Sequence, residues 1–202
     1  MISILQIQEA LELLRKGEII AYPTETVYGL AADATHPEAI QKIFDLKGRS
    51  DQSPIPILIH SFEVLPKYVK SFPMRAQALI DQFWPGPLTL IFEAKENIFP
   101  KELLSETGKI GVRVSSDPIA LKLCQEFGLP ITSTSANPSG KTPAHSAEEI
   151  RRYFLGSPLL KGCIDGGKRK STKVSTVLDV SSEPFKILRK GKITSAQLKG
   201  YL

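Results

Sequence analysis

The chain has 202 residues and a mass of 22.2 kDa, and 42% of its residues are hydrophobic while 23% are charged. This composition is that of a globular domain with its own core, and it excludes a disordered chain. The 26 lysines and arginines exceed the 21 aspartates and glutamates, which gives a net charge of +5 and a pI near 9.1. This mild basicity suits an anionic partner such as a nucleotide or RNA.

In chain order, helical and strand patterns alternate, which predicts an α/β or mixed α+β fold with partly parallel strand pairing. In the first half we expect helices over 7–16, 37–47 and 73–83, and strands over 19–22, 55–59 and 88–94. In the second half we expect strands over 110–114, 131–134, 176–180 and 186–189, and helices over 117–127, 146–154 and after 194.

Two local signals refine these boundaries. Pro54 and Pro56 cannot donate to a strand ladder, so the 55–59 strand is expected near a sheet edge or a bulge. Ser146 and Glu149 have the spacing of a capping box and predict the start of the helix that follows them.

The export and membrane signals are weak throughout. The longest apolar runs, such as 55–59 and 88–92, are far shorter than the roughly 20 residues of a membrane-spanning helix. The N-terminal stretch contains Glu9 and Glu12 and has no small-residue cleavage site, which argues against a signal peptide. We therefore expect a soluble, cytoplasmic protein.

The familiar catalytic signatures are missing. The sequence has no Walker A loop, no G-x-G-x-x-G after its first strand and no G-x-S-x-G elbow. His36, His60 and His145 are scattered, so we interpret them as solvated or capping residues. Cys124 and Cys163 cannot build a disulfide scaffold or a zinc site alone, and Cys124 fits a helical core position.

Two hydroxyl-rich loops follow predicted strands, where open α/β sheets hold their ligands. The stretch PTETVYGL (23–30) has two threonine hydroxyls, a carboxylate and a phenol, and Gly29 permits close backbone approach. The stretch TSTSANPSG (132–140) adds hydroxyls, an amide and backbone N–H groups that can cradle an anion. Ordinary turns are the alternative interpretation of both loops.

Cations accompany these loops. Lys47 and Arg49 can converge on phosphates, although Lys47-Gly48-Arg49 also has the form of a helix C-cap. Arg113 lies inside an apolar strand and needs a partner, either a ligand carboxylate or an internal acid. With the basic stretch 168–173, these residues predict a basic cleft for a phosphorylated ligand and a small carboxylate.

Six motifs occur together in order, namely PTETVYGLAADA (23–34), KGR (47–49), IGVRV (110–114), SANPSG (135–140), STVLD (175–179) and ILRKG (187–191). Together they resemble the YrdC family, the threonylcarbamoyl-AMP synthases of the short TsaC type, over about residues 5–191. The resemblance implies one YrdC-like domain over residues 1–202, with a twisted, largely β-sheet core, flanking helices and a concave basic cleft.

The resemblance also implies a nucleotidyltransferase. L-Threonine, bicarbonate or CO₂ and ATP, with Mg²⁺ carried by the ATP, would give L-threonylcarbamoyladenylate and pyrophosphate. Neither zinc nor an organic prosthetic group is expected, nor a cluster of side chains that binds the metal. Partner proteins would transfer the threonylcarbamoyl group to tRNA, and the loop 165–173 could contact tRNA or such a partner.

Site residues follow from the family motifs. The L-threonine contacts would be Thr26, Arg113, Ser133 and Ser175, with Tyr28 nearby. The K-x-R and S-x-N groups, which would be catalytic and would hold the ATP phosphates, are Lys47, Arg49, Ser135 and Asn137. Further nucleotide contacts would be Ser53, Thr142 and Arg189. The family's threonine-contacting histidine position falls on Leu58, and His60 lies two residues later.

Two alternatives compete with this hypothesis. The basic charge and the loop 165–173 are also compatible with an RNA-binding or ribosome-assembly factor, although no stacking motif for RNA is present. A related carbamoyl transferase could use the same fold, but it normally has additional domains.

Overall fold

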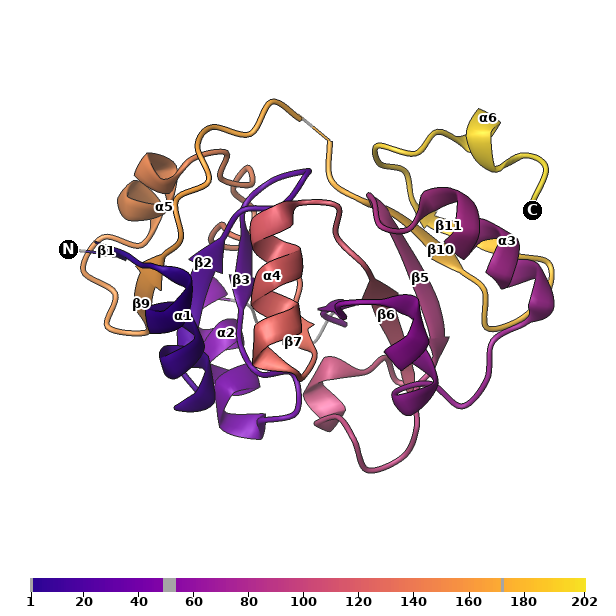
Figure 1. The fold of residues 1–202 in the computed structure, drawn as a ribbon, viewed down its shortest axis with the longest axis horizontal. Coiled ribbons are helices and arrows are strands. Elements are labelled where there is room, and N and C mark those ends of the chain that lie inside the picture. The colour runs from indigo at the N-terminus through magenta and orange to yellow at the C-terminus, as the bar shows by residue number, and fades with distance from the viewer. Residues whose placement is uncertain (1, 49–53, 172) are drawn as a thin grey trace.

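The computed structural model describes residues 2–48, 54–171 and 173–202, which form two mixed β-sheets flanked by helices (Figure 1). The five-stranded sheet has the order β1 (Ser3–Ile4), β9 (Leu160–Cys163), β2 (Ile19–Tyr22), β3 (Gly29–Ala31), β8 (Thr134–Ser135). The six-stranded sheet has the order β11 (Lys186–Arg189), β10 (Thr176–Asp179), β5 (Leu88–Glu93), β6 (Lys109–Arg113), β4 (Ile57–Leu58), β7 (Ile131–Thr132). Parallel pairs, such as β2 with β9 and β5 with β10, occur beside antiparallel pairs, so the predicted mixed α/β class is confirmed.

Helices cover the two sheets (Figure 1). They are α1 (Ile7–Arg15), α2 (Pro37–Lys47), α3 (Met74–Phe83), α4 (Pro118–Phe127), α5 (Ala147–Tyr153) and α6 (Ser195–Leu198), with short 3₁₀ turns at Phe62–Lys67 and Lys101–Leu103. Helices α1 and α4 lie side by side and bury Leu11, Leu14 and Leu123 in one apolar cluster. In the described part of the chain, no helix has the length and apolar character needed to cross a membrane.

Thr132 joins the two sheets. It ends β7 of the six-stranded sheet, and its side-chain oxygen donates to Leu30 O of β3 at 2.8 Å and accepts from Ala32 N at 3.0 Å. The Tyr22 hydroxyl of β2 donates to Thr132 O at 3.1 Å. Because buried polar groups cost free energy when unpaired, these bonds hold the sheets at a defined separation. The chain therefore passes from the six-stranded to the five-stranded sheet at Ser133, directly after Thr132.

The predicted elements are largely confirmed, but the strand predicted over 131–134 is wrong in one respect. It divides at Ser133 into β7 and β8, which belong to different sheets. Likewise, the 55–59 strand contracts to β4, which lies between β6 and β7 and not at an edge. Its two prolines cause no conflict there, because both lie outside the paired residues.

Other elements carry no local signal. Strands β1, β3 and β9 were not expected, because they have two to four residues and no alternating pattern that exceeds their surroundings. The Ser146 hydroxyl caps α5 by accepting from Glu149 N at 3.2 Å. The reciprocal half of the predicted capping box is absent among the described bonds, because the Glu149 carboxylate accepts from His145 N at 2.7 Å instead.

Candidate active site

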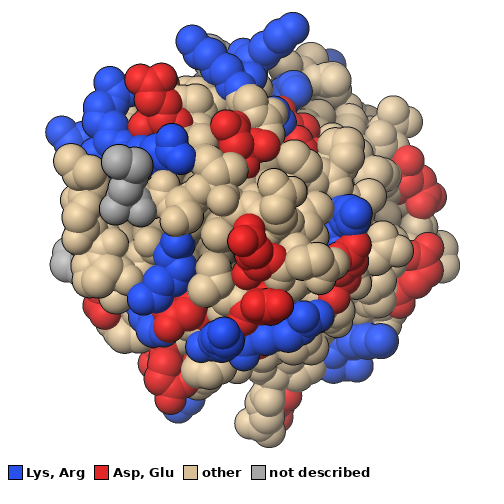
Figure 2. Space-filling view, turned by 60° about the vertical axis from the view of Figure 1, so that its left-hand side comes forward, with Lys and Arg blue, Asp and Glu red and all other residues tan. Residues whose placement is uncertain are grey.

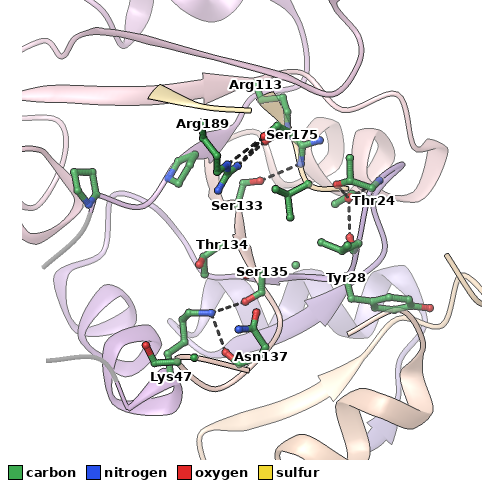
Figure 3. Close-up of a pocket in the computed structure, with 18 residues that line it drawn as sticks. Thr24, Tyr28, Lys47, Arg113, Ser133, Thr134, Ser135, Asn137, Ser175 and Arg189 are labelled. Carbon is green, nitrogen blue, oxygen red and sulfur yellow. Dashed lines mark hydrogen bonds between the residues drawn. The ribbon is translucent and has the colours of Figure 1, made fainter. Parts of the chain in front are cut away.

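A pocket of about 210 Å³ opens between the two sheets (Figure 3). Its lining comes from the loop after β2, the C-terminus of α2, the residues before β4, the end of β6, the β7–β8 segment with the loop after it, the residues just before β10, and the end of β11. This volume is below the roughly 300–1,000 Å³ of sites for drug-sized ligands, so its enclosed part suits a small ligand. Cations lie at two opposite ends, with hydroxyl groups between them (Figure 3).

The first end, here called the arginine end, consists of Arg113, Ser133, Ser175 and Arg189. Arg113 is 3% exposed, and its Nη1 donates to the carboxylate of Glu25 while its Nη2 donates to Ser133 Oγ at 3.1 Å. The Ser115 hydroxyl donates to the other Glu25 oxygen. Of the two partners that the sequence allowed for Arg113, an internal acid is present, namely Glu25. Arg113 also lines the pocket.

Arg189 reaches the same end from β11. Its Nη2 donates to Ser175 Oγ and Ser175 O, both at 3.0 Å, and its Nε donates to Ser175 O at 3.2 Å. Thr89 Oγ1 lies 2.9 Å from Ser175 Oγ and fixes that hydroxyl from behind. Partial removal from water, and secondly the charge of Arg113, lower the pKa of Arg189. Two guanidinium groups therefore share one end of the pocket.

The opposite end, here called the lysine end, consists of Lys47, Ser135 and Asn137. Lys47 lies in the last turn of α2, just before Gly48, whose φ of 60° reverses the chain in a left-handed cap. The buried ammonium donates to Ser135 O at 2.6 Å and to Asn137 O at 2.9 Å. The α2 C-cap and the phosphate-site hypothesis are therefore compatible, because the same turn directs Lys47 into the pocket.

Asn137 is held rigidly. Its Nδ2 donates to Pro138 O at 2.9 Å and to Lys141 O at 2.8 Å, which determines the orientation of the amide. Its Oδ1 is buried and accepts no hydrogen bond from any described residue. A buried acceptor without a donor is costly, so this oxygen is suited to a donor that a ligand brings.

The loop after β2 places two threonine hydroxyls at the pocket wall, whereas the hydroxyl of Tyr28 lies elsewhere. Thr24 Oγ1 donates to Val27 O at 2.7 Å and lies 2.9 Å from Thr26 Oγ1, and both threonines are buried at the pocket wall. The Tyr28 hydroxyl points away from the pocket (Figure 3) and is bonded to Asp165 Oδ1 at 3.2 Å and to the 166–167 backbone. Tyr28 thus lines the pocket through its other atoms, and a role for it beside L-threonine stays a prediction.

Gly29 serves packing as well as the pocket. A Cβ at this position would lie 3.0 Å from the Tyr22 ring, so the absent side chain makes room for that ring. The close approach predicted for Gly29 is thus to an aromatic side chain of the neighbouring strand.

Most of the predicted site residues come together, although their roles stay predictions. Those that line the pocket are Thr26, Lys47, Arg113, Ser133, Ser135, Asn137, Ser175 and Arg189. Thr142 is exposed, does not line the pocket and contacts Tyr153 Oη at 3.0 Å. Arg49 and Ser53 lie outside the described residues.

The predicted histidine position is occupied by a core residue. Leu58 is fully buried in β4 opposite Arg113, and neither it nor His60 belongs to the described lining. His36 is a capping residue as expected, since its Nδ1 accepts from Ala39 N at 3.4 Å at the start of α2.

The sequence did not identify Glu25 as the partner of Arg113. It also did not single out several residues that line the pocket, namely Pro56, Thr134, Ser139, Gly140 and Val174. Glu25 had a detectable signal, because it is a carboxylate within a hydroxyl-rich loop. Val174 and Pro56 had none, since they contribute only their position next to residues that pair in the sheets.

The thiols and the basic loop lie outside this pocket. Burial raises the pKa of Cys124 and of Cys163 to about 12, so both thiols are inert core groups, as expected for Cys124.

Arg169 of the loop 165–173 pairs with Asp117 at 2.7 Å. Figure 2 shows Lys and Arg side chains projecting from the top of the molecule, where Figure 1 places the orange loop after β9.

Comparisons with known proteins identify similar chains. The Sua5/YciO/YrdC family model, described as telomere recombination, matches residues 12–191. A threonylcarbamoyl-AMP synthase of Bacillus subtilis (strain 168) is 36% identical over 197 residues, which is 98% of this chain and 56% of that protein. A threonylcarbamoyl-AMP synthase of Vibrio parahaemolyticus is 36% identical over 186 residues, covering 91% of this chain and 98% of that protein.

A solved structure, P. abyssi Sua5 complexed with L-threonine, superposes with a TM-score of 0.91 at 37% identity, covering 97% of this chain and 57% of that one. The chain thus spans little more than half the length of the Bacillus relative and of this structure. The resemblance drawn from the six motifs is confirmed, and since the family model covers nearly the whole sequence, the chain belongs to the Sua5/YciO/YrdC family.

Proposed function

We propose that this chain is an L-threonylcarbamoyladenylate synthase, a nucleotidyltransferase that uses L-threonine, bicarbonate or CO₂ and ATP. The observation that carries the proposal is a pocket with cations at two ends and hydroxyls between them. An amino acid carboxylate suits one end and a triphosphate the other. The names of the relatives, and the L-threonine in the P. abyssi structure, support this assignment.

At the arginine end, Arg113 would pair with the carboxylate of L-threonine, and the hydroxyls of Thr26, Ser133 and Ser175 would orient the rest of it. The amine nitrogen attacks the carbon of CO₂, forming a C–N bond and a carbamate as the nitrogen loses a proton. A carbamate oxygen then attacks the α-phosphorus of ATP, and the bond to pyrophosphate breaks. Such chemistry needs positioning and charge neutralisation more than a protein nucleophile.

At the lysine end, Lys47, Ser135 and Asn137 would hold the phosphates, together with Arg49. Lys47 would neutralise charge that builds on the leaving pyrophosphate. Mg²⁺ bound with the ATP would supply positive charge that offsets the charge of the phosphates, and Lys47, Ser135 and Asn137 would hold this complex. The residues fit this ion, because Asn137 Oδ1 is an unused acceptor suited to a metal-bound water, while no carboxylate lines the described pocket to bind the metal alone.

The proposal extends to the cellular setting. Residues 1–202 would form one YrdC-like domain working in the cytoplasm, where its product would pass to proteins that transfer the threonylcarbamoyl group to tRNA. The exposed lysines of the loop 165–173 would give at most a weak tRNA contact, because Arg169 is already engaged with Asp117.

Pyrophosphate release tests the proposal. We expect release from ATP and Mg²⁺ that requires both L-threonine and bicarbonate, with the adenylate mass found by prompt mass spectrometry. Arg113→Ala should raise the apparent KM for L-threonine far more than that for ATP. Absence of release from a folded protein that binds ATP would contradict the proposal. Salt-dependent RNA titrations would then test a binding role, and carbamoyl phosphate assays a carbamoyl transferase.

A further inference from the structure

Arg169 lies outside the described pocket lining, yet it connects three separate segments of the chain. Its Nη1 donates to Asp117 Oδ2 at 2.7 Å and to Thr24 O at 3.5 Å, and its backbone N–H donates to His145 O at 2.7 Å. The side chains of Arg169 and Asp117 are only 19% and 7% exposed, so water screens their ion pair weakly. Any influence of Arg169 on the pocket must pass through these partners.

The contact with Asp117 continues as far as the pocket. The Asp117 backbone N–H donates to Ser115 Oγ at 3.2 Å, and the Ser115 hydroxyl donates to Glu25. Glu25 in turn accepts from Arg113. A hydroxyl has one proton and two lone pairs, so the N–H that Ser115 accepts leaves its proton for Glu25. The position of segment 115–117 therefore determines how Glu25 is held against Arg113.

Two acids and two arginines take part in this network. Glu25 pairs with Arg113, and Asp117 pairs with Arg169. Within the described part of the chain, these four side chains form no other ion pair, so their charges balance only while Arg169 is in place. Without Arg169, two poorly hydrated carboxylates would share one arginine, and the Arg113 guanidinium would be drawn toward the acids and away from the pocket.

The loop that carries Arg169 is anchored independently of its side chain. Gly166 N–H donates to Tyr28 Oη at 3.0 Å, and the Tyr28 hydroxyl donates to Gly167 O at 3.0 Å. A Cβ on Gly166 would lie 2.6 Å from Pro23 Cγ, so the loop packs closely on the loop after β2. A change of the Arg169 side chain should therefore remove its charge and its hydrogen bonds without releasing the loop.

We propose that Arg169 is a positioning residue for L-threonine binding. It neutralises Asp117 and so fixes the place of Ser115. Ser115 and Glu25 then hold Arg113 in the orientation that receives the ligand carboxylate. The inference rests on the proposed function, and it adds to that function a residue outside the pocket and outside the six motifs. Because Arg169 acts through the partners of Arg113, its loss should affect L-threonine and not ATP.

Calorimetric titration with L-threonine, without ATP or bicarbonate, tests this proposal in the absence of turnover. We expect Arg169→Gln to weaken L-threonine binding at least about tenfold, and Arg169→Lys, which keeps the charge, to weaken it less than about threefold. Asp117→Asn removes the acid but retains a side chain that caps α4. The double variant Arg169→Gln/Asp117→Asn should therefore bind within about threefold of the wild type. A double variant that binds as weakly as Arg169→Gln would overturn the proposal.

Lys170 provides the matched control, because it follows Arg169 directly on the same loop and is exposed. Lys170→Gln removes the same charge and should change L-threonine binding less than about twofold. An equal loss in Lys170→Gln would mean a general effect of charge and would overturn the assignment. Thermal unfolding checks that each variant is folded, and if Arg169→Gln alone is not, the double variant still tests the proposal through its affinity.

The synthase assay adds a comparison of the two substrates. Arg169→Gln should raise the apparent KM for L-threonine at least about tenfold and that for ATP less than about twofold. Equal rises for the two substrates would mean that the whole pocket is disturbed, and would overturn a role specific to L-threonine.

A measurement on the unliganded protein separates this inference from the proposed function. In Arg169→Gln/Glu25→Gln one acid and one arginine remain, so the fall in melting temperature should be at least about 3 °C smaller than the sum for the single variants. Additive falls would overturn the inference. If the wild-type protein neither binds L-threonine nor releases pyrophosphate, the proposed function fails, whereas non-additive falls would still establish the coupling of Arg169 to Glu25. If Arg169→Gln binds L-threonine normally, the inference fails and the proposed function stands.

Discussion

The buried ion pair between Glu25 and Arg113 predicts a large stability effect for a nearly isosteric change. The Arg113 side chain is 4% exposed and that of Glu25 is 11% exposed, so water screens neither charge well. Glu25→Gln keeps the size of the side chain and one acceptor oxygen for Arg113 or Ser115. What it removes is the negative charge, which leaves a buried guanidinium uncompensated in the unliganded protein.

Breaking a buried pair by removing one partner costs about 3–5 kcal/mol, and the retained acceptor places Glu25→Gln near about 3 kcal/mol. This is a large part of the roughly 5–15 kcal/mol that stabilises a typical domain. For a chain of this size it corresponds to a fall in melting temperature of roughly 6–12 °C. Urea denaturation followed by circular dichroism measures the free energy of unfolding directly, provided that the m-value is unchanged.

A double variant and a surface control make the result decisive. Removing both charges in Glu25→Gln/Arg113→Met should recover about 2 kcal/mol relative to Glu25→Gln, because no unpaired charge remains. Glu183→Gln, whose partner Arg75 is 51% exposed, should cost less than about 1 kcal/mol. The reasoning is refuted if Glu25→Gln costs as little as this control, or if the double variant is no more stable than the single one.

Three further predictions address the pocket and the core. Lys47→Met should lower kcat for pyrophosphate release about 10²–10³-fold, and an unchanged kcat would remove Lys47 from the phosphate site. Because burial raises the pKa of Cys124 and Cys163 to about 12, both thiols stay protonated at pH 8, so a thiol reagent should label them only after denaturation; rapid labelling of the native protein would contradict their burial. Tyr28→Phe should cost about 1–2 kcal/mol of stability by leaving Gly166 N–H without its acceptor, yet leave the KM for L-threonine unchanged; a tenfold rise would mean that the hydroxyl takes part in binding.

Local chemistry explains why many features were predictable. The N-cap at Asp117, whose carboxylate accepts from Ile119 N and Ala120 N, requires only the next three residues. The left-handed cap at Gly48 depends on glycine's freedom at positive φ. Such interactions form within one helical turn, so they follow from the sequence without knowledge of the partner strands.

Strand pairing set the limits of prediction. A two-residue strand such as β4 or β8 exists only because a neighbour supplies its hydrogen bonds. The turn of the chain at Ser133, which carries it from one sheet to the other, therefore has no local signature. The same holds for the Tyr28 hydroxyl, which turns to Asp165, 137 residues away, and not to the pocket that its neighbours line.

Residue order alone predicted the helices with their caps, the hydroxyl-rich loops, the unusual arginine at position 113 and the resemblance to the family. The tertiary structure was needed to show that Glu25 neutralises Arg113 across 88 residues, and that Arg189, from the exposed edge strand β11, shares that end of the pocket with no acidic partner among the residues that the structure describes. The physical reason is that charge balance in a pocket depends on distances between side chains from different strands. Those distances are set by sheet pairing and by the burial that accompanies it, and not by spacing along the chain.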